Sequence, residues 1–298
     1  MNAIEIRNLT KSFGQKTALA GLDMTVPVGA IYGFIGENGS GKSTTEKIIC
    51  GLIHKTSGDI KLYGKELTNE DVRAKMGVLI EAPGCYPNYT VWNNLMLQAT
   101  NLSIENPEIE VRKVLKLVRM EGATGNKYKN CSLGMKQRIG IAMALLGNPT
   151  LLVLDEPING LDADGMRIMR EVLVDIAKSG ATIVISSHIL GELEKIATHY
   201  GIIRHGKMLC EMTADELENS CRTYVALQAK DLSTAKQVLK TKYTSVEQDE
   251  TGYIRIYDSV KPEDVVSYLY DNSILISEIK TAKIGLEEYY IDLMKEGR

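Results

Sequence analysis

The sequence predicts an α/β protein with a mixed sheet, a helical insertion at about residues 85–145, and a small α+β domain at its C-terminal end. Three observations lead to this fold class. Short apolar runs that are typical of buried strands alternate with segments of helical periodicity. A glycine-rich loop joins one such strand to a helix. The composition then changes near residue 212, which predicts two domains, 1–211 and 212–298.

Apolar runs in the first part of the chain place buried strands at 31–35, 76–80, 151–154 and 182–186. Helical periodicity is found at 43–52, 165–178 and 190–198, and it dominates 90–145. Strands that alternate with helices in this way imply a parallel sheet with helices packed on it.

The C-terminal part has a different order of elements. The prediction is strand 224–228, helix 233–241, strands 245–249 and 253–257, helix 262–270 and strand 274–280. This β-α-β-β-α-β order predicts a small ferredoxin-like domain.

Composition and charge narrow the class of protein. The 298 residues have a formal net charge of −3, which disfavours nucleic acid as a partner because such a surface needs a basic face. No apolar run is long enough to cross a bilayer, and no secretory signal is expected. The cysteines show no metal-site spacing and are expected to be free thiols in a reducing cytoplasm: Cys50, Cys85, Cys131, Cys210 and Cys221.

The glycine-rich loop has the form G-x-x-x-x-G-K-[ST] and lies between a predicted strand and a predicted helix. It consists of Gly36, Glu37, Asn38, Gly39, Ser40, Gly41, Lys42 and Ser43. Backbone N–H groups and the helix N-terminus would surround phosphate oxygens, as in ATP. We expect Lys42 to reach the β- and γ-phosphates, Ser43 to ligate Mg²⁺, and Thr44 and Thr45 to offer further donors. The flanking strand and helix make a chance glycine-rich turn a poor alternative.

Acidic and imidazole side chains follow two of the apolar strands. Asp155 and Glu156 end the strand at 151–154, and His188 follows the strand at 182–186. At the carboxyl edge of a parallel sheet, Asp155 is expected to hold Mg²⁺ and Glu156 to act as general base toward a water. His188 is expected to hydrogen-bond the γ-phosphate or that water. A solvated acidic pair is the alternative, and it does not explain the coincidence with the phosphate loop.

A segment that begins with Ser132 and Gly134 opens an amphipathic helix. Its hydroxyl, glycine amide and helix N-terminus form an anion site that would extend to Met135 and Lys136. A plain N-cap is the alternative for Ser132. Phe13, one of two phenylalanines, precedes the phosphate loop and either stacks on an adenine or belongs to the core.

These motifs, in this order, resemble those of ATP-binding cassette (ABC) ATPases across residues 1–211. The match includes Gly160-Leu161-Asp162, and it implies a P-loop ABC ATPase core with a helical signature subdomain. The resemblance implies ATP and Mg²⁺ as cofactors and a head-to-tail dimer, formed by two copies or by paired ATPase subunits. Each nucleotide would lie between one chain's phosphate loop and the other chain's Ser132–Lys136 segment.

Three departures from the family pattern stand out. Glu81 occupies the place where the family usually has glutamine, and its carboxylate would ligate Mg²⁺ more strongly than an amide oxygen. The signature has Ser-Leu-Gly-Met-Lys instead of Ser-Gly-Gly-Gln, so Lys136 brings a cation toward the partner's nucleotide. Ile158 replaces a threonine.

Glu81, Pro83, Tyr86-Pro87 and Ser132–Arg138 are similar to a narrower group, the ATPases of lantibiotic self-immunity and bacitracin-resistance exporters. This resemblance implies an integral-membrane permease as partner, a peptide cargo that passes through it, and a location on the inner face of the plasma membrane. Two rivals remain. A cassette ATPase that acts on ribosomes or DNA is disfavoured by the single cassette and the acidic charge. A P-loop kinase or GTPase leaves the signature segment unexplained.

Overall fold

The computed structural model describes residues 1–67, 70–220, 223–249 and 251–296. The chain divides into two compact units, Met1–Ala214 and Asp215–Arg298. Each unit has a hydrophobic core of its own.

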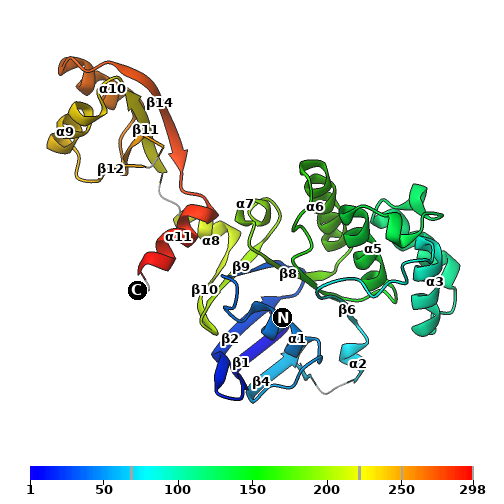
Figure 1. Ribbon diagram of the computed structural model, residues 1–298. Coiled ribbons are helices and arrows are strands. Elements are labelled where there is room, and N and C mark those ends of the chain that lie inside the picture. Colours follow the sequence, from blue (N-terminus) through cyan, green and yellow to red (C-terminus); the bar gives the residue numbers. More distant parts are fainter. Residues whose placement is uncertain (68–69, 221–222, 250, 297–298) are drawn as a thin grey trace. The chain divides into compact units, whose positions relative to one another are not determined.

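A six-stranded sheet forms the centre of the first unit, and Figure 1 labels its strands β10, β9, β8 and β6. The strand order is β10-β9-β3-β8-β7-β6. Its strands are β3 (Ile31–Ile35), β6 (Met76–Leu79), β7 (Leu151–Asp155), β8 (Thr182–Ser187), β9 (His199–Arg204) and β10 (Lys207–Thr213). Neighbouring strands from β9 to β6 are parallel, whereas β10 is antiparallel to β9. All residues of β3 and β8 are buried, which explains why their sequences do not alternate between apolar and polar residues.

A second, antiparallel sheet has the order β2-β1-β4-β5. Its strands are β1 (Asn2–Phe13), β2 (Lys16–Pro27), β4 (Ser57–Leu62) and β5 (Lys65–Glu66). Alternate residues such as Ile4 and Ile6 are buried in a core that also contains Phe34 of the larger sheet. Ile48 and Ile49 of helix α1 (Lys42–Ile49) belong to the same core. The helix that follows the phosphate loop is therefore fixed by both sheets.

The remaining helices of this unit are α2 (Glu70–Arg73), α3 (Val91–Asn101), α4 (Pro107–Leu117), α5 (Leu133–Leu145), α6 (Ala163–Lys178) and α7 (Leu190–Leu193), with 3₁₀ turns at Glu121–Ala123 and Tyr128–Asn130. Side chains cap several of them. Thr90 accepts a hydrogen bond from the Asn93 N–H at the start of α3. At the start of α6, Asp162 accepts one from the Gly165 N–H. Helices α3, α4 and α5 pack against one another, and α5 also packs on β6 and β7.

Two features differ from the sequence-based expectation. The helix expected at 190–198 ends at Leu193, and β9 and β10 were not expected at all. The hairpin between these strands turns at His205 and Gly206, which both have positive φ values. Strand β9 depends on its parallel pairing with β3. The Tyr32 side chain of β3 lies directly against Gly201 of β9, where a Cβ would come within 2.0 Å of the Tyr32 hydroxyl oxygen. Such tertiary pairing is not visible in a local pattern.

The second unit contains a four-stranded antiparallel sheet with the order β12-β13-β11-β14. Its elements are α8 (Ala214–Ser220), β11 (Thr223–Ala229), α9 (Leu232–Lys242), β12 (Val246–Gln248), β13 (Ile254–Ile256), α10 (Pro262–Asp271), β14 (Ile276–Lys283) and α11 (Leu286–Glu296). Val225, Leu239 and Leu269 show that β11, α9 and α10 share one core. Arg255 of β13 forms ion pairs with Asp249 and with Glu288 of α11.

Candidate nucleotide-binding site

The phosphate loop joins β3 to α1 with a backbone that only glycine allows at two positions. Gly41 has a φ of +117°, and a Cβ built on it would lie 2.7 Å from Leu19 Cδ2. A Cβ on Gly36 would lie 2.5 Å from the carbonyl oxygen of Ile203. A side chain at either position would displace neighbouring atoms, so the sequence dictates a tight loop at the N-terminus of α1.

Lys42 is the first residue of α1, and its ammonium group turns back over the loop. Nζ donates hydrogen bonds to the carbonyl oxygens of Gly36 (2.6 Å) and Glu37 (3.2 Å). Lys42 and Ser40 are buried, whereas Glu37, Asn38 and Gly39 at the tip of the loop are exposed, as is Ser43. A phosphate group in the loop would offer the same ammonium group anionic acceptors.

The three hydroxyl residues at the start of α1 have different surroundings. Ser43 is exposed and Thr44 is half-buried. Thr45 is fully buried, and both its hydroxyl and its backbone N–H donate to the Gly41 carbonyl oxygen, each over 2.9 Å. The expectation that Thr45 offers a donor to a phosphate is therefore wrong, because a helical threonine back-bonds to the carbonyl four residues earlier.

The carboxyl ends of β7 and β8 bring further motif residues to the edge of the sheet that holds the loop. β3, β8 and β7 are in register, with Ile35 opposite Ser187 and Asp155 opposite Ser186. Ser186 Oγ donates to Asp155 Oδ1 over 2.8 Å. This is the edge where ligands bind in parallel sheets.

Glu156 and His188 form a pair at the same edge. Glu156 Oε2 lies 2.7 Å from His188 Nδ1. Glu156 has a φ of +50°, and its backbone N–H donates to the carbonyl oxygen (3.2 Å) and to Oγ (3.1 Å) of Ser186. The carboxylate accepts, so Nδ1 is the donor of this pair.

Glu46 is a buried acid on α1 that the sequence analysis did not single out. It is fully buried, and within the described part of the chain neither carboxyl oxygen has a hydrogen-bond partner. Burial, and to a smaller extent the negative charge of Asp155, raises the pKa of Glu46 to about 8. One signal in the sequence indicates that Glu46 is buried. It lies one helical turn after Lys42 and three residues before Ile49, so it shares the buried face of α1 with Ile49.

Glu81 lies just beyond β6, at the same edge as Asp155. β6 pairs in parallel with β7, with Leu79 opposite Leu154. Glu81 has a φ of +64°, and its Oε1 accepts a hydrogen bond from Lys47 Nζ over 2.8 Å. The hydrogen bond from Lys47, together with its positive charge, lowers the pKa of the Glu81 carboxyl group.

The oxygen donors near the loop are of the kind that magnesium prefers, namely the Ser43 hydroxyl and the carboxylates of Asp155 and Glu81. Across residues 1–67, 70–220, 223–249 and 251–296, no three His, Cys, Asp or Glu side chains form a group that could hold a metal ion. The hydroxyl and carboxylate oxygens by themselves fit a magnesium ion that nucleotide phosphates help to hold.

The signature segment lies at the N-terminus of α5. Ser132 is the N-cap, and its Oγ accepts a hydrogen bond from the Met135 N–H over 3.3 Å. Ser132 is exposed, Gly134 and Met135 are half-buried, and Lys136 Nζ lies 5.6 Å from the centre of the Tyr128 ring. The capping interpretation therefore holds within the chain, and an exposed hydroxyl at a helix N-terminus remains accessible to an anion.

Phe13 ends β1 and is 51% exposed. Lys11 Nζ lies 4.7 Å from the centre of its ring. This exposure rules out the core interpretation and leaves a ring that an adenine can stack on.

An apolar groove of about 640 Å³ lies beside β6. Its walls come from β6, from residues 82–84, and from helices α3 and α5. Val78, Leu102 and Met143 are among the apolar side chains that line it. The segment that begins at Glu81 thus joins the nucleotide site to this groove.

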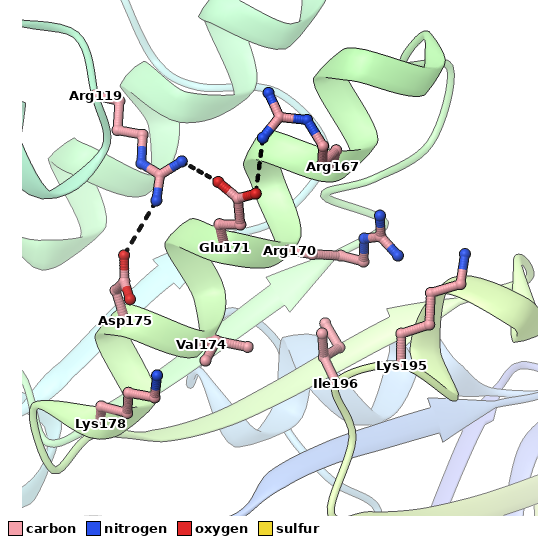
Figure 2. Close-up of a pocket in the computed structure, with 9 residues that line it drawn as sticks. All are labelled: Arg119, Arg167, Arg170, Glu171, Val174, Asp175, Lys178, Lys195 and Ile196. Atoms are coloured by element: carbon pink, nitrogen blue, oxygen red, sulfur yellow. Dashed lines mark hydrogen bonds and ion pairs between the residues drawn. The ribbon is translucent and has the colours of Figure 1, made fainter.

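A second hollow of about 320 Å³ lies along α6 and is lined mainly by charged side chains (Figure 2). Figure 2 shows Arg119, from the turn after α4, pointing toward Glu171 and Asp175 of α6. Arg119 pairs with both acids, and Arg167 pairs with Glu171 over 2.7 Å. Arg119 thereby links the turn after α4 to α6 through two ion pairs.

Comparison with known proteins adds to this geometry. The family model described as "ABC transporter" matches residues 19–159. The bacitracin transport ATP-binding protein BcrA of Bacillus licheniformis is 37% identical over 300 residues, which cover 99% of this chain and 98% of the relative. This chain belongs to the ABC transporter ATP-binding proteins. It is therefore an ATPase, the ATP-binding subunit of an ABC transporter.

Two further likenesses agree with this assignment. The lantibiotic transport ATP-binding protein SrtF of Streptococcus pyogenes is 43% identical to the ABC ATPase over 216 residues, covering 72% of this chain and 93% of SrtF. A solved structure of an ATP-binding subunit of an ABC transporter matches with a TM-score of 0.65 and 29% identity, over 73% of this chain and 92% of that chain. In the described part of the ABC ATPase, no helix is long and apolar enough to cross a membrane.

Proposed function

We propose that this ABC ATPase powers a separate membrane permease that exports antimicrobial peptides of the bacitracin or lantibiotic kind. The observation that carries the proposal is the likeness to BcrA, a bacitracin transport ATP-binding protein, which extends over 99% of the chain and so over both units. The likeness to SrtF, a lantibiotic transport ATP-binding protein, points to the same class of cargo.

ATP hydrolysis in this proposal uses the pair at the ends of β7 and β8. Glu156 accepts the proton of the attacking water while the oxygen of that water bonds to the γ-phosphorus and the bond to ADP breaks. His188 holds the Glu156 carboxylate through Nδ1 and fixes its direction, which the 2.7 Å distance supports. Lys42 neutralises the β- and γ-phosphates, and Phe13 stacks on the adenine.

The proposed metal ligands are Ser43, Asp155 and Glu81. Bound Mg²⁺ would neutralise charge on the β- and γ-phosphates. Asp155 is held for this task by the hydrogen bond from Ser186 (2.8 Å). Oxygen-only donors from three different elements support this assignment.

We further propose a head-to-tail dimer, either of two copies or with a paired ATPase subunit. Ser132, Gly134, Met135 and Lys136 of one chain would face the nucleotide in the loop of the other. The exposure of Ser132 at the N-terminus of α5 supports this role, because a helix N-terminus attracts the γ-phosphate. ATP would then close the dimer, and hydrolysis would release it.

The groove beside β6 is the proposed docking surface for the permease. Its apolar lining fits a permease helix, and residues 82–84 connect it to Glu81 at the nucleotide site. Docking there would place the ABC ATPase on the inner face of the plasma membrane. Nucleic acid is not a proposed partner.

We also propose two domains, a nucleotide-binding domain over 1–211 with a helical subdomain at about 85–145, and a small α+β domain over 212–298. The division of the chain into two compact units after Ala214 supports this proposal. For the second domain we propose a ferredoxin-like fold. The strand order β12-β13-β11-β14 with antiparallel neighbours supports this fold.

The proposal can be tested in a strain that lacks the gene, by measuring its susceptibility to bacitracin and to a lantibiotic. Wild-type protein should restore resistance, and Glu156→Gln should not, because it removes the general base. Glu105→Gln, at an exposed glutamate between α3 and α4, is the matched control and should restore resistance. Unchanged susceptibility of the deletion strain to both peptides would refute the cargo class. Full rescue by Glu156→Gln would refute coupling to hydrolysis.

A further inference from the structure

Lys47 and Glu81 form an ion pair beside the proposed metal ligands. Lys47 lies on α1 four residues after Ser43, so the two residues share one face of the helix. Lys47 Nζ is 2.8 Å from Glu81 Oε1, and the side chains of Lys47 and Glu81 are 33% and 72% exposed.

The ammonium group of Lys47 is paired with one acid of the nucleotide site and lies in the field of another. The hydrogen bond to Glu81 is the largest cause of its raised pKa, and the negative charges of Glu81 and Asp155 add to it. Asp155 ends β7, and Glu81 is the second residue after β6. Asp155 and Glu81 are the carboxylates proposed to hold magnesium.

This ion pair differs from an ordinary surface pair in its backbone setting. Exposed pairs contribute about 1 kcal/mol or less to stability. Glu81, however, has a φ of +64°, a conformation that non-glycine residues adopt at an energetic cost. The residue is thus held in an unfavourable conformation at the position where its carboxylate meets Lys47. Residues 82–84, which line the groove, follow directly.

We propose that Lys47 of α1 is the resident counter-cation of the metal site. Its ammonium group holds the Glu81 carboxylate close to α1 and competes with magnesium for that carboxylate. The inference rests on the proposed role of Glu81 as a metal ligand. Two cations cannot both make full use of the same carboxylate charge. As a metal ligand, Glu81 would therefore give up part of its interaction with Lys47, and Lys47 would lower the metal affinity of the nucleotide complex.

The test is the affinity of the full chain for Mn²⁺ at saturating ADP, measured from the electron paramagnetic resonance signal of free Mn²⁺. No turnover is needed, so the readout is independent of catalysis. Lys47→Met should tighten Mn²⁺ binding about three- to tenfold, the equivalent of an ion pair of about 1 kcal/mol. Lys47→Arg keeps the charge and should bind Mn²⁺ within about twofold of wild type.

A double substitution separates this role from a general change in charge. In the Glu81→Gln background, Lys47→Met should change Mn²⁺ affinity by less than about twofold, because the contested carboxylate is gone. The inference is overturned if Lys47→Met leaves Mn²⁺ affinity unchanged or weakens it, or if the same gain appears in the Glu81→Gln background. Circular dichroism checks that each variant is folded, and Lys47→Gln replaces Lys47→Met if the latter is not.

Failure of this inference can be told apart from failure of the proposed function. A wild-type chain that binds ADP and Mn²⁺ and hydrolyses ATP, but shows no effect of Lys47→Met, contradicts only the role of Lys47. A wild-type chain that binds no Mn²⁺ in the presence of ADP contradicts the proposed metal site itself.

Discussion

Glu156 Oε2 lies 2.7 Å from His188 Nδ1, although the two residues follow different strands and are 32 positions apart in the sequence. The parallel pairing of β7 with β8 brings them together, and the left-handed backbone at Glu156 directs its side chain toward the ring. The hydrogen bond with the imidazole thereby orients the carboxylate.

Glu156→Gln should bind ATP and hydrolyse it about 10²- to 10⁴-fold more slowly, because the amide cannot accept the proton of the attacking water. Phosphate release measures the rate. With ATP present, size-exclusion chromatography should show the variant as a dimer, since unhydrolysed ATP keeps the two chains together. Glu105→Gln should match wild type in both assays. A variant that stays monomeric with bound ATP would contradict the dimer.

Glu46→Gln should stabilise the protein, increasingly so as the pH rises from about 4.5 to about 8. The pKa of Glu46 is raised from 4.5 to about 8 in the folded state. Between these values the folded chain binds a proton that the unfolded chain has released, so the free energy of unfolding of the wild type falls with rising pH. The neutral glutamine removes this loss of stability, which amounts to about 3–5 kcal/mol for a single carboxyl group with such a pKa shift.

Urea unfolding at pH 5, 6.5 and 8 measures that difference between variant and wild type. Glu105→Gln, at an exposed site, should show little dependence on pH. A difference for Glu46→Gln that stays constant across this range would contradict the raised pKa.

Gly77→Ala should destabilise the first unit by about 3 kcal/mol, because it overpacks a rigid contact. A Cβ on Gly77 of β6 would lie 2.1 Å from the carbonyl oxygen of Ala144 in α5 and 2.5 Å from Leu152 Cδ2. Thermal or urea unfolding measures the loss. Gly84→Ala is the matched control, since a Cβ there meets no atom within 4 Å, and it should change stability by less than about 0.5 kcal/mol. Equal effects of the two substitutions would contradict the tight packing of α5 on β6.

Asp249→Asn should destabilise the second unit at pH 7 by about 1–3 kcal/mol, and by less as the pH falls. Burial opposes ionisation of this carboxyl, yet hydrogen bonds from Thr251 and Tyr253 and the ion pair with Arg255 lower its pKa to about 2. The unfolded value is 3.8, so the stabilising effect is present above about pH 4 and is lost as the pH falls through about 2.

Urea unfolding at pH 7 and at pH 3 tests this. Asp271→Asn, at an exposed acid of α10, should have little effect at either pH. A loss for Asp249→Asn that is as large at pH 3 as at pH 7 would contradict the lowered pKa.

Local chemistry in the sequence determined much of this protein. The spacing of Gly36, Gly41 and Lys42 specifies a phosphate loop, because glycines at these places permit the required backbone. Apolar runs bounded by Asp155 and by Ser187 locate the strand ends, since fully buried parallel strands need continuous apolar residues. Likewise, the C-terminal order of strands and helices follows from local periodicity.

Only the tertiary structure decided which partners the side chains of the nucleotide-binding site have. It buries Glu46 beside Asp155, commits the Thr45 hydroxyl to the Gly41 carbonyl oxygen, and sets Lys47 against Glu81. Burial and pairing depend on which distant segments meet. The free energies of desolvation and of ion pairing therefore depend on distances in three dimensions and not on spacing along the chain. For the same reason β9, which is fixed by its neighbour β3, was not predicted from the sequence.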